Sequence, residues 1–274
     1  MKGAAALVRL LAVALLAGGL ACVMIRFSPG YGLDENQLDP RLSSASQDAI
    51  RRSHDGIGSL GFSVSLNRPV RELLAERCGP TAVLMLWGLA GAWLLAAVLA
   101  APPLALRMPW LGAVANALGG IPAALPAAGI AVALFRLGAS PRWMIALALV
   151  PRLYQYLRGL LVKAYSSPHV LMARGKGLGP GRVLWSHVLR PARGQIFALA
   201  AVSVNMAIGA AVAVEAVCDL PGLGQLAWKA ALARDLPVLV ALTILIALVT
   251  QAANFAADQA APAEAAAPAF GGER

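Results

Sequence analysis

The sequence predicts an all-α membrane protein, a polytopic bundle of about six transmembrane helices. Apolar residues make up 59% of the 274 residues and charged residues only 13%, with a mean hydropathy of +0.71, which is far from the balance of a soluble domain. Long intervals without an ionised side chain recur, and a charge at mid-bilayer costs at least about 2.5 kcal/mol. We therefore expect one transmembrane domain over residues 1–274.

Charge-free intervals, the first of which runs from Leu10 to Ile25, define the expected spans. The spans are about 7–25, 80–101, 111–135, 143–157, 195–214 and 236–257. The fourth is the weakest, because Pro151 and Arg152 interrupt it, and it decides whether both termini lie on one side. If it crosses, we expect Arg152 near the exit, where its long side chain reaches the headgroups. Residues 26–79 and 158–194 then form the two longest loops, and 259–274 form a flexible tail.

The first interval has a second interpretation. Lys2 and Arg9, together with a short apolar run, resemble a secretory signal or a lipoprotein signal that ends at Cys22. The preceding Gly19-Leu20-Ala21 fits a lipobox poorly, so we favour an uncleaved first span.

A basic, glycine-punctuated segment lies between the fourth and fifth spans. It reads Met172-Ala-Arg-Gly-Lys-Gly-Leu-Gly179, and residues 158–193 carry seven Lys or Arg and no Asp or Glu. The glycines and Pro180 cannot sustain a long regular helix, so they predict a bend between two short helices. We expect the segment to bind a partner outside the membrane through the cations Arg174 and Lys176. Its expected apolar anchors are Leu178, Val183, Leu184 and Trp185.

The alternative for this segment is an ordinary basic connection that holds the topology and touches lipid headgroups. The net charge of +10 has the same explanation, since the basic residues lie between apolar runs, and nucleic-acid binding is not expected. No G-x-x-x-x-G-K-[ST] phosphate loop occurs, and the histidines at 54, 169 and 187 lack metal-ligand spacing. We assign no catalytic residue, cofactor or metal site.

Polar side chains inside the spans are candidates for a translocation path, because lipid leaves such groups unsatisfied. They are Asn116, Ser203 and Asn205. Hydrogen bonding between helices is the alternative, and it is favoured for Asn205. Small residues at Gly112, Asn116 and Gly120, and at Ala113 and Ala117, predict a packing face on the third span.

Two further features leave alternatives open. Pro122 and Pro126 are expected to kink the third span, either as a hinge or as tolerated structural prolines. A disulfide between Cys78 and Cys218 is conceivable in an oxidising compartment, but free thiols are favoured.

Three stretches in order resemble the inner-membrane permease of ATP-binding-cassette (ABC) importers in the dipeptide, oligopeptide and nickel group. The first stretch is Gly61-Phe-Ser before Arg68-Pro69-Val70 and Thr81. The second is Ala173-Arg-Gly-Lys-Gly-Leu178, with Arg152 and Arg158 upstream as in relatives and His187-Val-Leu-Arg190 downstream. The third runs from Glu215 to Gly224, then through Arg234-Asp-Leu-Pro237 to Asn254 and Asp258. His169 and Cys218 depart from the aromatic residues usual in relatives.

The resemblance implies a fold like that of a type I ABC importer permease, located in the bacterial inner membrane with both termini cytoplasmic. The loop 158–194 would be cytoplasmic, with coupling helices that dock on a separate ATPase, and 26–79 would lie outside. The implied ATPase-coupling residues are Ala173, Arg174, Gly175, Lys176, Gly177 and Leu178. The implied outer scoop loop contains Glu215, Pro221, Gly222 and Gly224, although Glu215 has the alternative role of ending the fifth span at the interface.

The implied partners are ABC ATPase subunits, a second permease subunit, a periplasmic or lipid-anchored solute-binding protein and membrane lipid. Peptide is the expected solute. An ion-gradient-driven secondary transporter is the first alternative, but it needs carboxylates near mid-membrane and the spans have none. The second alternative is a membrane-anchored protein that binds a partner through residues 26–79 without transport.

Overall fold

The computed structural model describes residues 61–63, 65–106 and 108–260, together with Ala12, Leu16 and Gly19. The expected first span, the fate of Cys22, most of the 26–79 loop and the tail after residue 260 lie outside the described residues. The chain divides into two compact units, which are described separately below. Unit 1 comprises Met1–Leu84 and Ala211–Gln251, and unit 2 comprises Met85–Ala210 and Ala252–Arg274.

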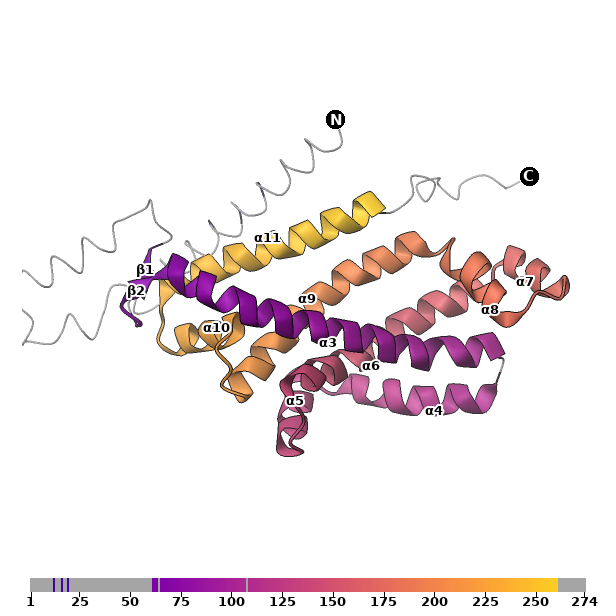
Figure 1. Ribbon diagram of the computed structural model, residues 1–274, viewed down its shortest axis with the longest axis horizontal. Helices are drawn as coiled ribbons and strands as arrows, with labels where there is room; N and C mark the ends of the chain where they lie inside the picture. The colour runs from indigo at the N-terminus through magenta and orange to yellow at the C-terminus, as the bar shows by residue number, and fades with distance from the viewer. Residues whose placement is uncertain are drawn as a thin grey trace, which may run out of the picture. The chain divides into compact units, whose positions relative to one another are not determined.

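The described residues are helical apart from one small hairpin (Figure 1). Its strands are β1 (Phe62–Ser63) and β2 (Arg68–Pro69), which pair antiparallel. The helices are α3 (Val70–Leu106), α4 (Pro109–Gly119), the 3₁₀ turn η2 (Ile121–Ala124), α5 (Ala127–Arg136), α6 (Pro141–Tyr165), α7 (Pro168–Gly175), α8 (Pro180–Arg182), the π-helical segment η3 (Val183–Leu189), α9 (Arg193–Val217), α10 (Leu223–Leu232) and α11 (Leu236–Ala260).

Four of the described helices, α3, α6, α9 and α11, are long and apolar enough to cross a membrane. A fifth crossing is possible if Pro109–Ala124 and Ala127–Arg136 act as one broken span. Proline stands in the first turn of α4, α6, α7 and α8, where its missing N–H leaves no hydrogen bond unmade. The chain is therefore a helical membrane protein with four or five candidate spans in its described part.

The expected third span is not one continuous helix. α4 ends at Gly119, η2 follows, and α5 begins at Ala127 at an angle of 108° to the preceding piece. Pro122 and Pro126 lie inside this break, where neither can donate a backbone hydrogen bond to a continuing helix. The predicted kink is therefore present, and it is sharp enough to separate two helices.

The predicted small-residue face of the third span packs only in part: Asn116 and the Gly120 carbonyl accept hydrogen bonds from Tyr154 and Gln155 on α6. Ala113 and Ala117 are exposed, whereas Ala115 and Gly119 are buried. A Cβ added at Gly119 would lie 2.5 Å from Cδ1 of the Tyr154 ring on α6. The face that packs therefore includes Gly119 beside Asn116 and Gly120, because the Tyr154 ring needs a position without a side chain.

α3 carries a second small-residue face, which the sequence analysis did not identify. Gly88, Ala92, Ala96 and Ala100 recur at every fourth position and all are buried. A Cβ on Gly88 would lie 2.4 Å from Cγ2 of Ile145, so α3 and α6 approach closely within unit 2. Such contacts between small residues hold helices together in lipid, where burial of apolar surface gives no driving force.

The expected fourth span is the most buried of the candidate spans. Pro151 lies inside α6 without ending it, and the helix continues past the expected exit at Leu157 to Tyr165. Arg152 therefore lies near the middle of α6, and its expected position near the exit of the span remains a prediction.

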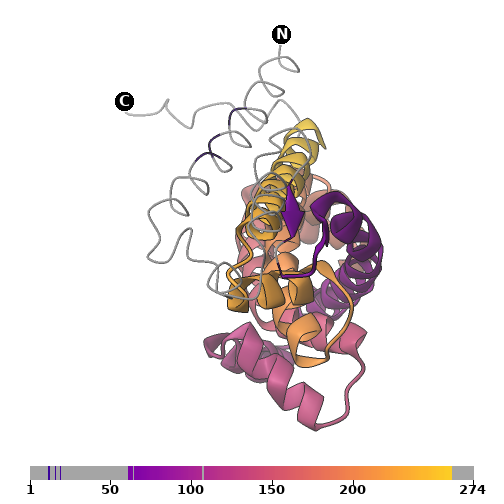
Figure 2. The ribbon, with the colours of Figure 1, turned by 90° about the vertical axis from the view of Figure 1, so that its left-hand side faces the viewer.

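Unit 1 has its own apolar core. The first turns of α3 contribute Val70 and Leu73, α10 contributes Leu226, and α11 contributes Val238 and Leu242. The hairpin lies at the N-terminal end of α3 (Figure 2). Its strands are held there by the backbone hydrogen bond from Val70 N–H to the Gly61 carbonyl, 3.2 Å long.

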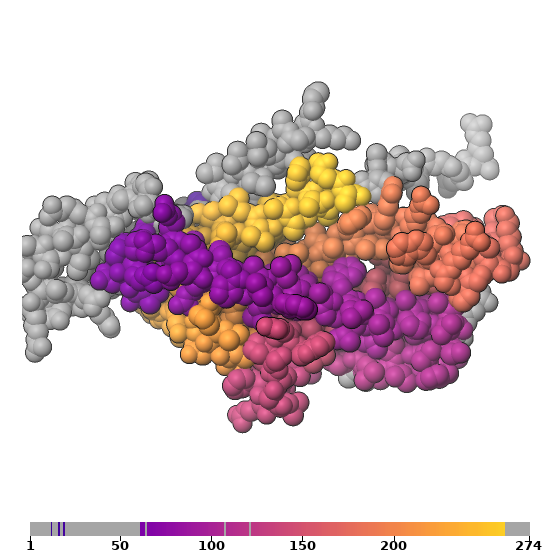
Figure 3. Space-filling model, viewed as in Figure 1, coloured from indigo at the N-terminus to yellow at the C-terminus, as the bar shows by residue number. Residues whose placement is uncertain are grey.

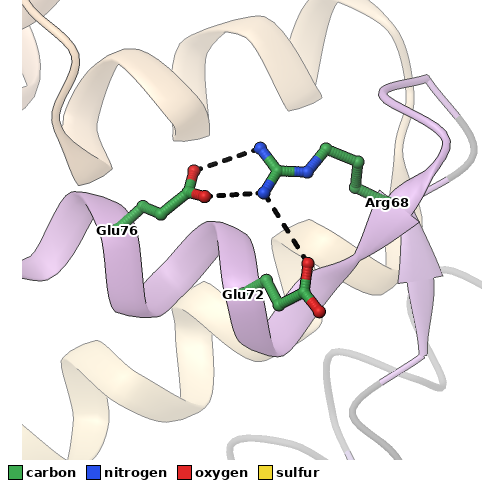
Figure 4. Close-up of polar contacts among 3 residues, drawn as sticks. All are labelled: Arg68, Glu72 and Glu76. Atoms are coloured by element: carbon green, nitrogen blue, oxygen red, sulfur yellow. Dashed lines mark hydrogen bonds and ion pairs between the residues drawn. The ribbon is translucent and has the colours of Figure 1, made fainter.

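An exposed charge cluster joins β2 to α3 (Figure 4). Both terminal nitrogens of Arg68 donate to the Glu76 carboxylate, at 3.1 and 2.6 Å, and Nη2 lies 3.6 Å from Glu72. The Glu76 carboxylate raises the pKa of Arg68 above its ordinary value. Glu72 also places negative charge in the first turn of α3, where the helix dipole favours it.

Candidate functional site

The basic segment folds as a helix, a turn and a second helical piece. α7 ends at Gly175, Gly177 adopts φ +75°, and α8 begins at Pro180 and continues into η3. Gly177 needs to be glycine because a side chain is strained at that φ. His169 Nε2 lies 3.1 Å from the carbonyl oxygen of His187, which ties α7 to η3. Figure 3 shows the atoms of this loop, in salmon, gathered at one end of α6 and α9.

The loop presents an outward surface that differs in part from the predicted one. Lys176 and Gly177 are exposed as expected, and Trp185 is 71% exposed. Val183 is buried within the loop, so its predicted role as an apolar anchor is wrong, and Ala173 is buried as well. The exposed apolar residues that the prediction missed are Leu171 and Met172 at 54% and 66% exposure. Leu171 and Met172 lie two residues and one residue before the buried Ala173, so the helix turns their side chains to the outer face of α7.

Arg174 is directed into unit 2 and away from the outward surface of the loop. Its Nη2 donates to the Leu104 carbonyl at 3.2 Å, and its guanidinium lies 4.6 Å from the centre of the Tyr165 ring. The Leu104 carbonyl belongs to the last turn of α3, where backbone acceptors lack helical partners. Arg174 therefore anchors the loop within unit 2, which leaves Lys176 as the exposed cation at the bend.

Glu215 is the centre of a buried polar turn in unit 1. It lies in the last turn of α9, which runs past the expected end at Val214 to Val217, and it is 1% exposed. Its Oε1 accepts from the Thr81 hydroxyl at 2.7 Å, and its Oε2 accepts from the Gly224 N–H at 2.7 Å and from the Gln225 N–H at 3.3 Å. Thr81 in turn accepts from the Leu223 N–H at 2.8 Å.

The donors of this turn are the first backbone N–H groups of α10, which have no partners within the helix. A carboxylate at a helix N-terminus is favoured by both hydrogen bonding and the helix dipole. The glycines at 222 and 224 allow the approach, because a Cβ at either would lie within 3.0 Å of the Glu215 carboxylate. Glu215 thus closes the turn onto α10, and its place in the last turn of α9 is compatible with the other predicted role, that of ending the fifth span.

A second buried carboxylate, Asp235, was not among the predicted site residues. It is 1% exposed, and its Oδ2 accepts from the Ser63 hydroxyl at 2.5 Å, the Ser65 hydroxyl at 2.7 Å and the Ser65 N–H at 3.0 Å. It therefore fastens the hairpin to the start of α11. Asp235 could have been noticed in the sequence because it stands directly before a charge-free run. Nothing near it in the sequence identified its partners Ser63 and Ser65, which are 172 and 170 residues away.

The predicted path residues Asn116 and Ser203 bond between helices of unit 2. The Tyr154 hydroxyl donates to Asn116 Oδ1 at 2.8 Å, and the Trp93 indole N–H donates to the Ser203 hydroxyl at 3.1 Å. Asn116 also borders a hollow of about 490 Å³ with Tyr154 and Arg158. Asn205 lines a different hollow, which is described below.

We predict that Tyr154→Phe destabilises the protein by about 1 kcal/mol, because it removes the hydrogen bond to Asn116 while the ring keeps its place against Gly119. The measurement is the thermal midpoint of the purified protein in detergent. Tyr156→Phe is the matched control, since Tyr156 is 57% exposed on the same helix, and it should leave the midpoint unchanged. Equal shifts for the two variants would contradict the role of the bond.

Cys78 and Cys218 are both free thiols and half-buried in unit 1, as favoured from the sequence. Burial raises the pKa of the Cys218 thiol, which lies just beyond the end of α9. The group is therefore poorly poised to form the thiolate that disulfide exchange requires.

Comparison with known proteins assigns the chain to a family. Residues 92–263, more than half of the sequence, match the family described as binding-protein-dependent transport system inner membrane component. The oligopeptide transport system permease protein AppB of Bacillus subtilis (strain 168) is 32% identical over 118 residues, which are 43% of this chain and 37% of that protein. A peptide permease protein of Brucella ovis is 26% identical and covers 88% of this chain and 90% of its own length.

A further relative, the oligopeptide transport system permease protein OppB of Salmonella typhimurium, is 30% identical over 106 residues, 39% of this chain and 35% of that protein. The match to AppB and OppB therefore spans little more than a third of each, whereas the Brucella match is nearly full-length. The family confirms the resemblance, and its match includes the second and third sequence stretches. It also excludes an enzyme, since its members are membrane components of transport systems. The chain belongs to the family of binding-protein-dependent transport system inner membrane components, and it is a multi-pass permease of the inner membrane.

Proposed function

We propose that this permease forms half of the translocation pathway of an ABC importer for peptides. The coupling partner is a separate ATPase subunit, and a second permease subunit supplies the other half. A periplasmic or lipid-anchored solute-binding protein delivers the solute. The peptide assignment is supported by the names of the relatives, which are oligopeptide and peptide permeases.

The observation that carries the ATPase coupling is the form of the loop between α6 and α9. It combines the exposed cation Lys176 at a bend with the exposed apolar side chains Met172 and Trp185. Large apolar residues beside a cation are typical of the energetically dominant part of a protein interface. In this proposal the loop lies on the cytoplasmic side, and with the proposed six spans both termini lie there too.

The Glu215 turn belongs to the opposite side in this proposal. Pro221 and Gly222 form the turn between α9 and α10, and Glu215 and Gly224 hold it closed. A rigid turn of this kind suits an outer scoop that caps the pathway and meets the solute-binding protein.

We predict that Lys176→Glu weakens binding of the ATPase subunit at least about tenfold, because it places a carboxylate where the partner receives a cation. The measurement is co-purification and equilibrium binding of the ATPase to the detergent-solubilised permease. The matched control is Lys229→Glu, an equal change of charge on α10 at a half-exposed side chain.

Lys229→Glu should leave ATPase binding unchanged and both variants should insert normally into the membrane. Unchanged binding for Lys176→Glu, or equal losses for both variants, would contradict the proposed docking role of the loop. Labelling of an introduced Lys176→Cys from the external side of intact cells would contradict its cytoplasmic location.

A further inference from the structure

Unit 2 contains a hollow of about 340 Å³ at the break in the third span. One wall is the break and the first turn of α5, with Leu125 and Ala127. The other walls are α6, with Leu149 and Arg152, and α9, with Asn205 and Gly209. Its volume is in the range of small-molecule sites. Arg152 and Asn205 both lie near the middle of their helices, and the side chain of Arg152 is exposed at the mouth of the hollow.

Arg152 is a cation without a partner among the described residues. No hydrogen bond or ion pair joins it to any of them, and no Asp or Glu occurs in the sequence between Glu76 and Glu215. An arginine at the centre of a membrane helix costs at least about 2.5 kcal/mol when it is left unpaired. Such a residue is retained where it meets water, a lipid phosphate or an anionic ligand.

The N-terminus of α5 opens into the same hollow and independently favours an anion. α5 begins at Ala127 after Pro126, and no side chain caps its first turn. The first N–H groups of the helix are therefore free to donate, and the helix dipole places partial positive charge there. Broken membrane helices in transporters direct such ends at anionic groups of their substrates. Asn205 adds an amide to the third wall.

We propose that this hollow is a subsite for a carboxylate of the translocated solute, such as the C-terminal carboxylate of a peptide, with Arg152 as its principal contact. The inference rests on the proposed function as a peptide permease and names the group that the pathway recognises. The guanidinium donates two parallel hydrogen bonds to a carboxylate, and the first turn of α5 contributes further positive potential.

The test uses the complete transporter in proteoliposomes, with its ATPase, second permease and binding protein, and two probes. The probes are trialanine with a free C-terminal carboxylate and trialanine amide. We expect Arg152→Gln to lower the uptake of trialanine at least about tenfold and to leave that of the amide within about twofold. Arg152→Lys keeps the charge but loses the paired donors, so its uptake of trialanine should lie between that of the wild type and that of Arg152→Gln. The same binding protein is used throughout. Its preference for one probe over the other therefore cancels when the uptake of each probe by a variant is divided by its uptake by the wild type.

Arg136→Gln at the exposed end of α5 is the matched control and should leave the uptake of both probes unchanged. Equal losses for acid and amide with Arg152→Gln would overturn the proposal, because a lipid-phosphate anchor or a folding defect has that effect. Uptake of both probes at wild-type rates would overturn it as well. If the wild-type complex moves neither probe, the peptide assignment and the subsite fail together, whereas every other outcome tests the subsite alone.

Discussion

Gly224→Ala is expected to destabilise the permease by about 3 kcal/mol or more. An added Cβ would lie 2.5 Å from the Cα of Val212, and a backbone atom of α9 cannot turn aside as a flexible side chain can. α10 would have to move away from α9, and its first N–H groups would leave the Glu215 carboxylate. The measurement is the thermal midpoint in detergent, together with the amount of protein recovered from membranes.

The control for this prediction is Gly79→Ala in the same unit. Nothing lies within 4 Å of the position its Cβ would take, and alanine is the better helix former by about 1 kcal/mol. Gly79→Ala should therefore be neutral or stabilising. A Gly224→Ala protein with an unchanged midpoint would show that α9 and α10 do not approach as closely as described.

Glu215→Ala is expected to cost about 3–5 kcal/mol. The substitution removes the shared acceptor of the Thr81 hydroxyl and of the Gly224 and Gln225 N–H groups, and at 1% exposure water cannot replace it without opening the turn. Glu215→Gln keeps the volume and one carbonyl oxygen, so it should lose less. The thermal midpoint and protease sensitivity between α9 and α11 report both effects.

Thr81→Val should cost less stability than Glu215→Ala. It removes one hydroxyl and leaves in place the hydrogen bonds that the N-terminal N–H groups of α10 donate to Glu215. A Glu215→Gln protein as unstable as Glu215→Ala would indicate that the charge, and with it the helix dipole, outweighs the individual hydrogen bonds. Equal stability of all three variants and the wild type would refute the buried turn.

The helical class and the candidate spans within the described residues followed from charge-free intervals, because the cost of a buried charge is a local property of the sequence. The bend at Gly177 was also predictable, because the effect of glycine and proline on a helix is local to the sequence as well. The packing faces were not: Ala113 and Ala117 had the right spacing, yet the bulk of Tyr154 selects Gly119 instead. The spacing of small residues does not tell which partner each face meets.

Long-range polar pairs escaped prediction for a related reason. Thr81 and Glu215 are 134 residues apart, and Asp235 and Ser63 are 172 apart. Each looks like an ordinary helix-end or loop residue by itself. Arg174 was predicted to be an outward cation, and only the folded position of α3 shows that it has an inward acceptor.

The inward contacts of Arg174 have a mechanical consequence. Its guanidinium is joined to a carbonyl in the last turn of α3 and stacked on a ring at the end of α6. A push on α7 that preserves these two contacts must carry the ends of both long helices with it. One side chain would then couple a displacement of α7 to a joint tilt of α3 and α6.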